Sequence, residues 1–179
     1  KSPVYYGIKH FQNLRSNERG ADYILLTAEP FMALARDYCS FIHEQKGYRV
    51  ALINVQDVFD EYGYGYPTPL SIREFLKSTT RWQLPMPSYV FLVGKGTYDF
   101  KYVFAGTNKS LWPPNFIPPF GYPVSDVLFT VFDEAGPLPQ MYIGRLPAQT
   151  VGEFARYFDW HKSYISQKND EWNKTFLMF

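Results

Sequence analysis

Cysteine and long apolar runs are the scarcest features of this sequence. The single cysteine, Cys39, excludes an internal disulfide framework and any zinc site built from several thiolates. No apolar run approaches the roughly 20 residues that a membrane-spanning helix needs, and no charged-then-apolar leader is present. We therefore expect that any signal peptide or membrane span lies outside these residues, and that the chain is a piece of a larger protein.

Charge of one sign is also lacking, because 18 basic residues are balanced by 17 acidic ones. No stripe of Lys or Arg stands out, which argues against nucleic acid as a partner. A length of 179 residues with 46% hydrophobic and 20% charged content suits one globular domain. We predict a single domain over residues 1–179, opened by a lead-in segment over residues 1–20.

Aromatic residues are abundant, at 20% of the chain. Many of them crowd together with five of the 14 prolines in residues 98–123, where proline makes a helix difficult to form. We predict a long ordered loop that is packed by its own rings. Loops of this length are more often functional or interface-forming than mere connections.

The first half of the chain alternates between strand and helix signals. Three apolar runs predict buried strands over residues 21–27, 48–55 and 89–93. A helix is predicted from Pro30 to a stop at Gly47, and a second one after Thr68 as N-cap, with Ile72, Phe75, Leu76 and Thr79 on its inner face. Residues 56–67 favour one loose helical turn.

This alternation predicts a parallel sheet with right-handed crossovers and helices on both faces. The predicted fold class is therefore α/β, a three-layer αβα sandwich with a mainly parallel sheet, resembling a flavodoxin-like or caspase-like half domain.

The second half is expected to add a strand pair and a helix. Residues 127–132 and 140–144 flank a turn-rich stretch and predict a hairpin or a strand pair appended to the sheet. Thr150 and Glu153 form a capping box that opens a third helix, whose inward stripe is Val151, Phe154, Ala155, Phe158 and Ile165. The final "KTFLMF", residues 174–179, has the composition of a further strand.

The loop "GKGT", residues 94–97, follows a strand and raises the question of phosphate binding. The spacing fits neither a P-loop nor a dinucleotide fingerprint, and no helix start follows. Gly94 and Gly96 are better explained as permitting a tight turn at the strand end. A free-standing binder of a small anion at this loop remains the weakest of three functional hypotheses.

Few residues suggest catalysis. Cys39 and His43 lie four apart on the first predicted helix, but Cys39 falls within the apolar stripe and is interpreted as structural. Asp99 and Asp126 are expected at the rim of the sheet, where they could cap loop amides. Arg145 could form a buried ion pair, clamp the long loop or lie at the surface. Asp133 and Glu134 are interpreted as turn formers, and we expect no metal and no cofactor.

The order of motifs resembles the amino-terminal half of the catalytic module of the gingipain family of cysteine peptidases. The resemblance runs from about Asn13 to the last residue and is carried by six stretches: "NLRSNERGADYILLTAEPF", "YRVALINVQDVFDEYGYG", "PLSIREFLKS", "YVFLVGKGTYD", "PVSD" and "MYIGRLPAQTVGEF". Where members commonly show Gly-Asp-Gly, this chain has lysine between Gly94 and Gly96.

The resemblance implies a caspase-like module of two subdomains, with this chain as the first. The family's catalytic histidine, in a Gly-His-Gly context, and its nucleophilic cysteine follow later strands, so no catalytic residue is carried over. The candidate site residues are therefore those expected at the edge of the cleft: Gly94, Gly96, Tyr98, Asp99, Asp126 and Arg145.

The leading hypothesis is a non-catalytic subdomain of a secreted or cell-surface cysteine endopeptidase of a Gram-negative bacterium, with a protein or peptide substrate. The alternative is a subdomain, of a type IX secretion sortase-like protein or an inactive relative, that docks an outer-membrane partner through residues 98–123.

Overall fold

The computed structural model of the chain describes residues 8–99, 103, 114–133, 136 and 138–167. The strands are β1 (Tyr23–Thr27), β2 (Val50–Asn54), β3 (Tyr89–Val93) and β4 (Tyr142–Leu146). The helices are α1 (Met32–Lys46), α2 (Val55–Tyr62), α3 (Pro69–Thr79) and α4 (Val151–Ser166), with short 3-10 turns η1 (Glu29–Phe31) and η3 (Asp126–Phe129).

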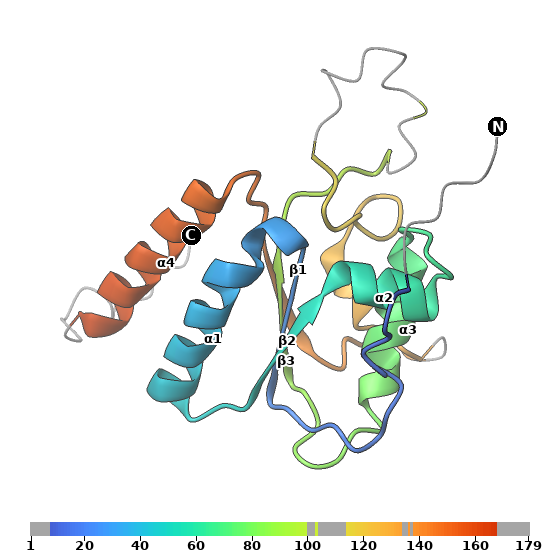
Figure 1. Cartoon of the computed structure of the whole chain (residues 1–179), viewed down its shortest axis with the longest axis horizontal. Coiled ribbons are helices and arrows are strands. Elements are labelled where there is room, and N and C mark those ends of the chain that lie inside the picture. The colour runs from blue at the N-terminus through green and yellow to red at the C-terminus, as the bar shows by residue number, and fades with distance from the viewer. Residues whose placement is uncertain (1–7, 100–102, 104–113, 134–135, 137, 168–179) are drawn as a thin grey trace.

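The four strands form one parallel sheet in the order β2-β1-β3-β4. Helices α1 and α4 cover one face of this sheet, and α2 and α3 cover the other (Figure 1). The predicted three-layer α/β sandwich is therefore confirmed. Because all strands run the same way, their carboxyl ends meet at one edge, which is where ligands bind in folds of this kind.

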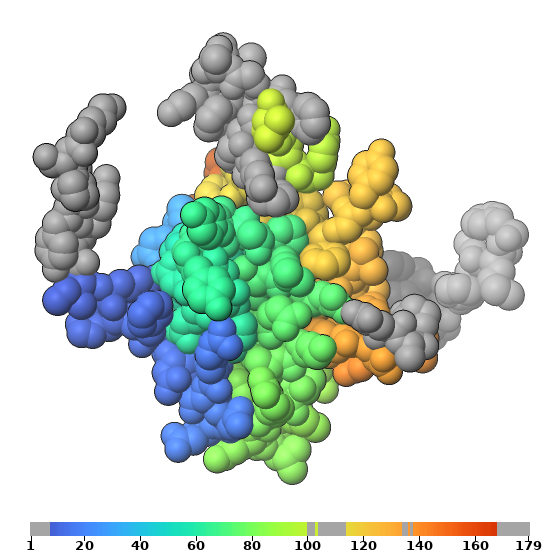
Figure 2. All heavy atoms as spheres, turned by 90° about the vertical axis from the view of Figure 1, so that its right-hand side faces the viewer, coloured from blue at the N-terminus to red at the C-terminus, as the bar shows by residue number. Residues whose placement is uncertain are grey.

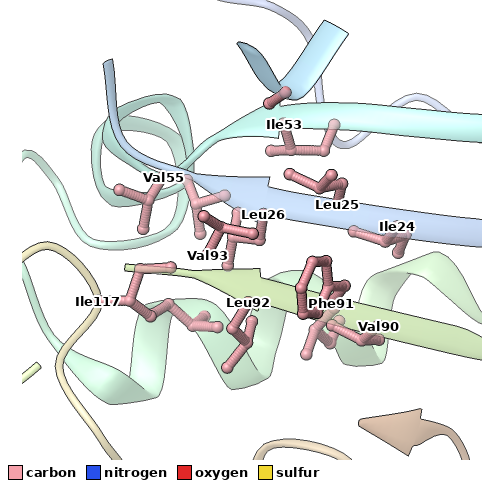
Figure 3. Close-up of a cluster of buried hydrophobic side chains, with 14 of the residues drawn as sticks. Ile24, Leu25, Leu26, Ile53, Val55, Val90, Phe91, Leu92, Val93 and Ile117 are labelled. Carbon is pink, nitrogen blue, oxygen red and sulfur yellow. The ribbon is translucent and has the colours of Figure 1, made fainter. Parts of the chain in front are cut away.

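The central strands β1 and β3 are buried on both faces, as their uninterrupted apolar composition predicts. Ile24, Leu25 and Leu26 of β1 are inaccessible to solvent, and Leu92 and Val93 of β3 are too. Figure 3 shows these side chains projecting from the two neighbouring strands, with Ile117 placed beside the end of β3. The core is thus continuous through the sheet and reaches the loops at its carboxyl edge.

Helix α1 begins and ends close to the predicted residues. Pro30 lies in η1, directly ahead of α1, rather than in the first turn of α1 itself. Gly47 has φ of +70°, and its N–H donates to the carbonyl of His43 at 2.7 Å. This left-handed stop is favoured by glycine because it has no Cβ.

The second helical layer departs from the prediction at α2, which has two full turns where we expected one loose turn. The Asn54 side chain caps α2 by accepting from the Gln56 N–H at 2.9 Å, and Val55, Val58 and Phe59 are buried. The apolar anchors and the cap outweigh the two downstream glycines. For α3 the predicted Thr68 cap and the inner face are confirmed.

The predicted hairpin or strand pair over residues 127–132 and 140–144 is wrong for its first run, which is not a strand, whereas its second run overlaps β4. Residues 126–129 form η3, and β4 is parallel to β3 rather than paired with the preceding run. Phe129 is fully buried, and the Thr130 N–H donates to the carbonyl of Val127 at 2.9 Å, which closes a tight turn. A short apolar run has the same composition in a buried turn as in a strand, so its pattern could not distinguish the two.

Helix α4 has the predicted Thr150 cap, whose Oγ1 accepts from the Glu153 N–H at 3.3 Å. The Glu153 carboxylate accepts a hydrogen bond from the N–H of Gln149, whereas a capping box would have it accept from the N–H of Thr150. Phe154 and Phe158 are buried as predicted, but Val151 is 44% exposed. The inward face includes Tyr157 and His161, because both rings contact Tyr38 of α1.

The lead-in segment lies against α2, visible in Figure 2 where the blue segment meets the turquoise and green helices. Lys9 Nζ lies 3.0 Å from Asp57 and also contacts Asp60. The Leu14 N–H donates to Glu61 Oε2 at 2.7 Å, and the Leu14 side chain is buried. Residues 8–15 are thus held on the surface of α2 by charge and by one apolar anchor.

No helix among the described residues is long and apolar enough to span a bilayer. The strand predicted over residues 174–179 lies outside the described residues, as do most of residues 100–113 of the predicted long loop.

Candidate functional site

The carboxyl edge of the sheet is organised around the adjacent ends of β1 and β3. The chain leaves β1 toward β2 on one side and leaves β3 toward β4 on the other, so the strand order reverses between them. The fully buried Thr27 links the two ends, because its Oγ1 donates to the Val93 carbonyl at 2.8 Å. In open α/β sheets such a reversal point is the usual place for a ligand.

Gly94 and Gly96 sit just past β3 and are overlaid by residues 116 and 117. Gly94 has φ of +142°, and a Cβ there would lie 2.9 Å from Cβ of Phe116. A Cβ at Gly96 would overlap the carbonyl oxygen of Ile117. The two glycines therefore permit another backbone segment to cross directly over the strand end.

The amides of the "GKGT" loop donate hydrogen bonds to the crossing segment and to the end of β4 and the residues after it. The Gly94 and Lys95 N–H groups donate to the carbonyls of Leu146 and Ala148, each at 2.9 Å. The Thr97 N–H donates to the Asn115 side chain at 3.1 Å. Because these three amides are already paired within the chain, the loop does not present them to a phosphate, which argues against the anion-binding hypothesis for this loop.

Arg145, at the end of β4, ties the edge together with four hydrogen bonds. Its Nε and Nη2 each donate to a carboxylate oxygen of Asp126 at 2.7 Å, in a bidentate pair. Its Nη1 donates to the carbonyls of Gly94 and Ile117 at 2.9 and 2.8 Å. With its side chain only 12% exposed, Arg145 is the buried clamp among the alternatives that the sequence left open.

These residues line a pocket of about 270 Å³. Its wall includes Lys95, Gly96, Asp126 and Arg145, and the remaining lining is mostly proline and valine side chains. The pocket lining contains two cationic side chains, Lys95 and Arg145. The guanidinium N–H groups of Arg145 are directed at Asp126 and at two carbonyls. The pocket is thus a rigid, partly apolar recess built by the strand ends.

Tyr98 and Asp99 stand apart from this recess. Tyr98 is 62% exposed, and neither residue lines the pocket. One Asp99 carboxylate oxygen accepts from the Val103 N–H at 2.7 Å, and the Asp99 N–H donates to the Thr97 side chain at 3.3 Å. The structure therefore brings four of the six candidates together and places these two at the start of the long loop.

The thiol of Cys39 and the imidazoles of His43 and His161 are engaged in the fold. Burial raises the pKa of the Cys39 thiol to about 12, which keeps it protonated at neutral pH. The His43 Nδ1 hydrogen bonds to the Tyr48 carbonyl at 2.8 Å, and the His161 Nδ1 to the Tyr38 hydroxyl at 2.9 Å. Within the described ranges no three His, Cys, Asp or Glu side chains gather as a metal site would require.

Sequence reasoning missed Phe116 and Ile117, which form the roof over the two glycines. Their amides donate to the Lys95 carbonyl at 2.8 and 3.3 Å, and Ile117 is fully buried. The pair of glycines separated by one residue was the signal, since it indicates a backbone approached from outside. What the sequence did not indicate was which segment makes that approach.

The fold and this edge define a parallel α/β sandwich in which loops cover the carboxyl ends of the strands. The model of peptidase family C25 matches residues 16–179, and the chain belongs to this gingipain family of cysteine peptidases.

A solved structure with the same fold is the dimeric latent PorU from Porphyromonas gingivalis. The superposition has a TM-score of 0.68 at 22% sequence identity and covers 80% of this chain. It covers only 15% of the PorU chain, so this chain spans a small part of that protein's length. A search of the curated proteins finds no match.

Proposed function

We propose that the chain is the non-catalytic amino-terminal subdomain of a gingipain-type cysteine endopeptidase. Membership of peptidase family C25 over residues 16–179 is the observation that carries this proposal. A cysteine peptidase needs a thiolate activated by a histidine base. The state of Cys39, protonated and inside the helix packing, is consistent with a nucleophile and base supplied by a later part of the protein.

In this proposal the carboxyl-edge pocket forms one wall of the substrate cleft. Its rigid clamp, Arg145 with Asp126, would hold the loops at the strand ends in place while the second subdomain provides the reacting groups. The protein would be secreted or held at the surface of a Gram-negative bacterium, and its substrate would be a protein or peptide.

The test is an assay of the purified chain against a broad panel of peptide substrates. We expect no cysteine-dependent cleavage, and the same result for Cys39→Ala. A longer protein carrying this chain should cleave peptides and lose activity on thiol alkylation. Turnover by the isolated chain that is abolished in Cys39→Ala would overturn the assignment.

A second candidate function is partner docking at the same edge. Tyr98 is 62% and Tyr122 is 96% exposed, and Val124 and Val127 are also open to solvent. Exposed aromatic and aliphatic groups gathered in one region are typical of interaction surfaces. The partner would be an outer-membrane component of a type IX secretion apparatus.

Hydrogen exchange distinguishes the two candidates. Docking predicts that amides of residues 96–99 and 120–128 become protected when purified secretion components are added, while those of α1 do not change. Unchanged protection throughout would contradict docking and would leave the cleft-wall proposal in place.

A further inference from the structure

A second pocket shares no lining residue with the carboxyl-edge recess and is formed where the lead-in segment meets α2 and α3. In Figure 2 this is the junction of the blue amino-terminal segment with the green helix α3. The pocket measures about 410 Å³, and we call it the basic pocket. Its lining includes Arg15, Tyr62, Glu74, Lys77, Ser78 and Arg81. It therefore has three cationic side chains and one carboxylate.

The three cations of the basic pocket lack carboxylate partners. None of Arg15, Lys77 and Arg81 has an Asp or Glu oxygen within 4.0 Å in the part of the chain that the structure describes. In contrast, Lys9 and Arg145 are each paired with acids. Three neighbouring positive charges repel one another, and an anion placed among them would relieve that repulsion.

Arg15 is held in position at the wall of the basic pocket. Its guanidinium carbon lies 4.3 Å from the centroid of the Tyr62 ring, and its Nη2 donates to the Glu61 carbonyl at 2.6 Å. The Tyr62 ring is itself fixed, because its hydroxyl hydrogen bonds to Ser78 Oγ at 2.7 Å. A guanidinium fixed by stacking and one hydrogen bond keeps other N–H groups available to an oxyanion, at little cost in side-chain entropy.

The other two cations, Lys77 and Arg81, lie at and just past the carboxyl end of α3. Lys77 lies in the last turn of α3 and Arg81 follows two residues after the end of the helix, and both line the pocket. Burial raises the pKa of Tyr62, while Arg15 and Arg81 both act to lower it. Both guanidinium groups therefore exert their field at the same hydroxyl in the wall of the pocket.

We propose that the basic pocket binds a doubly charged oxyanion, a phosphate or sulfate group, through Arg15, Lys77 and Arg81. Planar guanidinium groups match the oxygen spacing of such anions, and an ammonium adds a point charge. Glu74 opposes any anion, but three cations against one carboxylate leave the pocket with a net positive charge. Because the Coulomb attraction grows with the charge of the anion, a dianion gains more there than a singly charged carboxylate. This site is separate from the cleft-wall function and does not depend on it.

The test is a calorimetric titration of the chain with inorganic phosphate, sulfate and acetate at constant ionic strength. We expect saturable binding of phosphate and sulfate in the millimolar range or tighter, and no saturation by acetate. The Lys77→Gln/Arg81→Gln double variant should weaken phosphate binding at least about tenfold, because two charge-assisted contacts are lost. Glu74→Gln should strengthen it.

Arg156→Gln is the matched control, because Arg156 is an exposed arginine on α4 outside the basic pocket. It should leave phosphate binding unchanged, and the melting temperature of each variant verifies that the fold is retained. The proposal is overturned if phosphate and sulfate do not saturate, if acetate binds as well as phosphate, or if Arg156→Gln weakens binding as much as the double variant does.

Discussion

At the scale of single residues, Gly96 and Arg145 organise the carboxyl edge in opposite ways. Gly96 acts through the side chain that it lacks, because the Ile117 carbonyl occupies the space where a Cβ would stand. Arg145 acts through a side chain that reaches four acceptors on three separate segments. Both features fix the course of the same crossing segment.

Substitution of Gly96 by alanine should destabilise the chain by about 2 to 3 kcal/mol, because a backbone carbonyl has to move to admit the methyl group. Gly144→Ala is the matched control, since no atom lies within 4 Å of a Cβ built there. We expect its effect to stay within about 0.5 kcal/mol. Urea unfolding of both variants measures the difference, and equal effects would contradict the close approach of Ile117.

Neutralising Asp126 should also be costly. Asp126→Asn removes the charge that pairs with the largely buried Arg145, and we expect a loss of about 2 kcal/mol in the free energy of unfolding. The corresponding change in an exposed pair is Asp159→Asn, whose carboxylate lies 3.9 Å from Lys162. That variant should lose less than about 0.5 kcal/mol. If both lose equally little in chemical denaturation, Arg145 is not a clamp.

At the scale of elements, the contact between α1 and α4 depends on rings and on one polar link. Tyr38 of α1 is buried against Phe154 and Phe158 of α4, with ring centroids 5.7 and 5.1 Å away. The His161 imidazole continues this stack and hydrogen bonds to the Tyr38 hydroxyl. The helix pair therefore includes a titratable group within an aromatic interface.

This link predicts a pH dependence of stability. Burial, and then the nearby Lys46, lower the pKa of His161 below its ordinary value of 6.5. The folded state thus holds His161 neutral, whereas the unfolded chain takes up a proton as the pH falls through 6.5. The contribution of His161 to stability is complete above that pH and is lost progressively below it.

The measurement is the free energy of unfolding between pH 8 and 5 for the wild type and for His161→Gln. The difference between the two proteins should be constant at high pH and should shift in favour of the variant as the pH falls. Subtracting the curves removes the contribution of carboxylates common to both proteins. A difference that does not vary with pH would contradict a lowered pKa.

At the scale of the whole molecule, one core joins both helical layers through the sheet. Buried residues from α1 and α4 on one face, and from α2 and α3 on the other, belong to a single cluster that includes the strands. A shared core of this kind favours unfolding in one cooperative step. The single domain over residues 1–179 stays a prediction.

We predict that urea unfolding followed by far-UV circular dichroism and by tryptophan fluorescence gives the same midpoint. The buried Trp82 reports on the layer of α3, where its ring lies 6.2 Å from that of Phe75. Alkylation of Cys39 in α1 after brief pulses reports on the other layer. Separate transitions for the two layers would show that they are independent units.

The parts of the fold that follow from local pattern were predictable. Thr68 and Gly47 act on the backbone within a few residues of themselves, so the caps and stops of α3 and α1 could be read from the sequence. The uninterrupted apolar runs of β1 and β3 identified them as buried strands. The alternation of these elements predicted the parallel sheet.

The local pattern failed where distant contacts decide the conformation. Residues 127–132 turn back on themselves because Phe129 enters the core and Asp126 pairs with Arg145. Val151 was assigned to the inner face of α4, yet the helix is oriented by Tyr157 and His161 meeting Tyr38. Neither contact can be inferred from spacing along the chain.

The sequence by itself determined the fold class, the positions of most helices and strands and the resemblance to the gingipain family, because short-range propensity and motif order are properties of the chain. Only the tertiary structure decided that Arg145 reaches Asp126, that Ile117 covers Gly96 and that Arg15 joins Lys77 and Arg81. Each of these meetings joins residues far apart in sequence, and packing of the whole core is what brings such residues together.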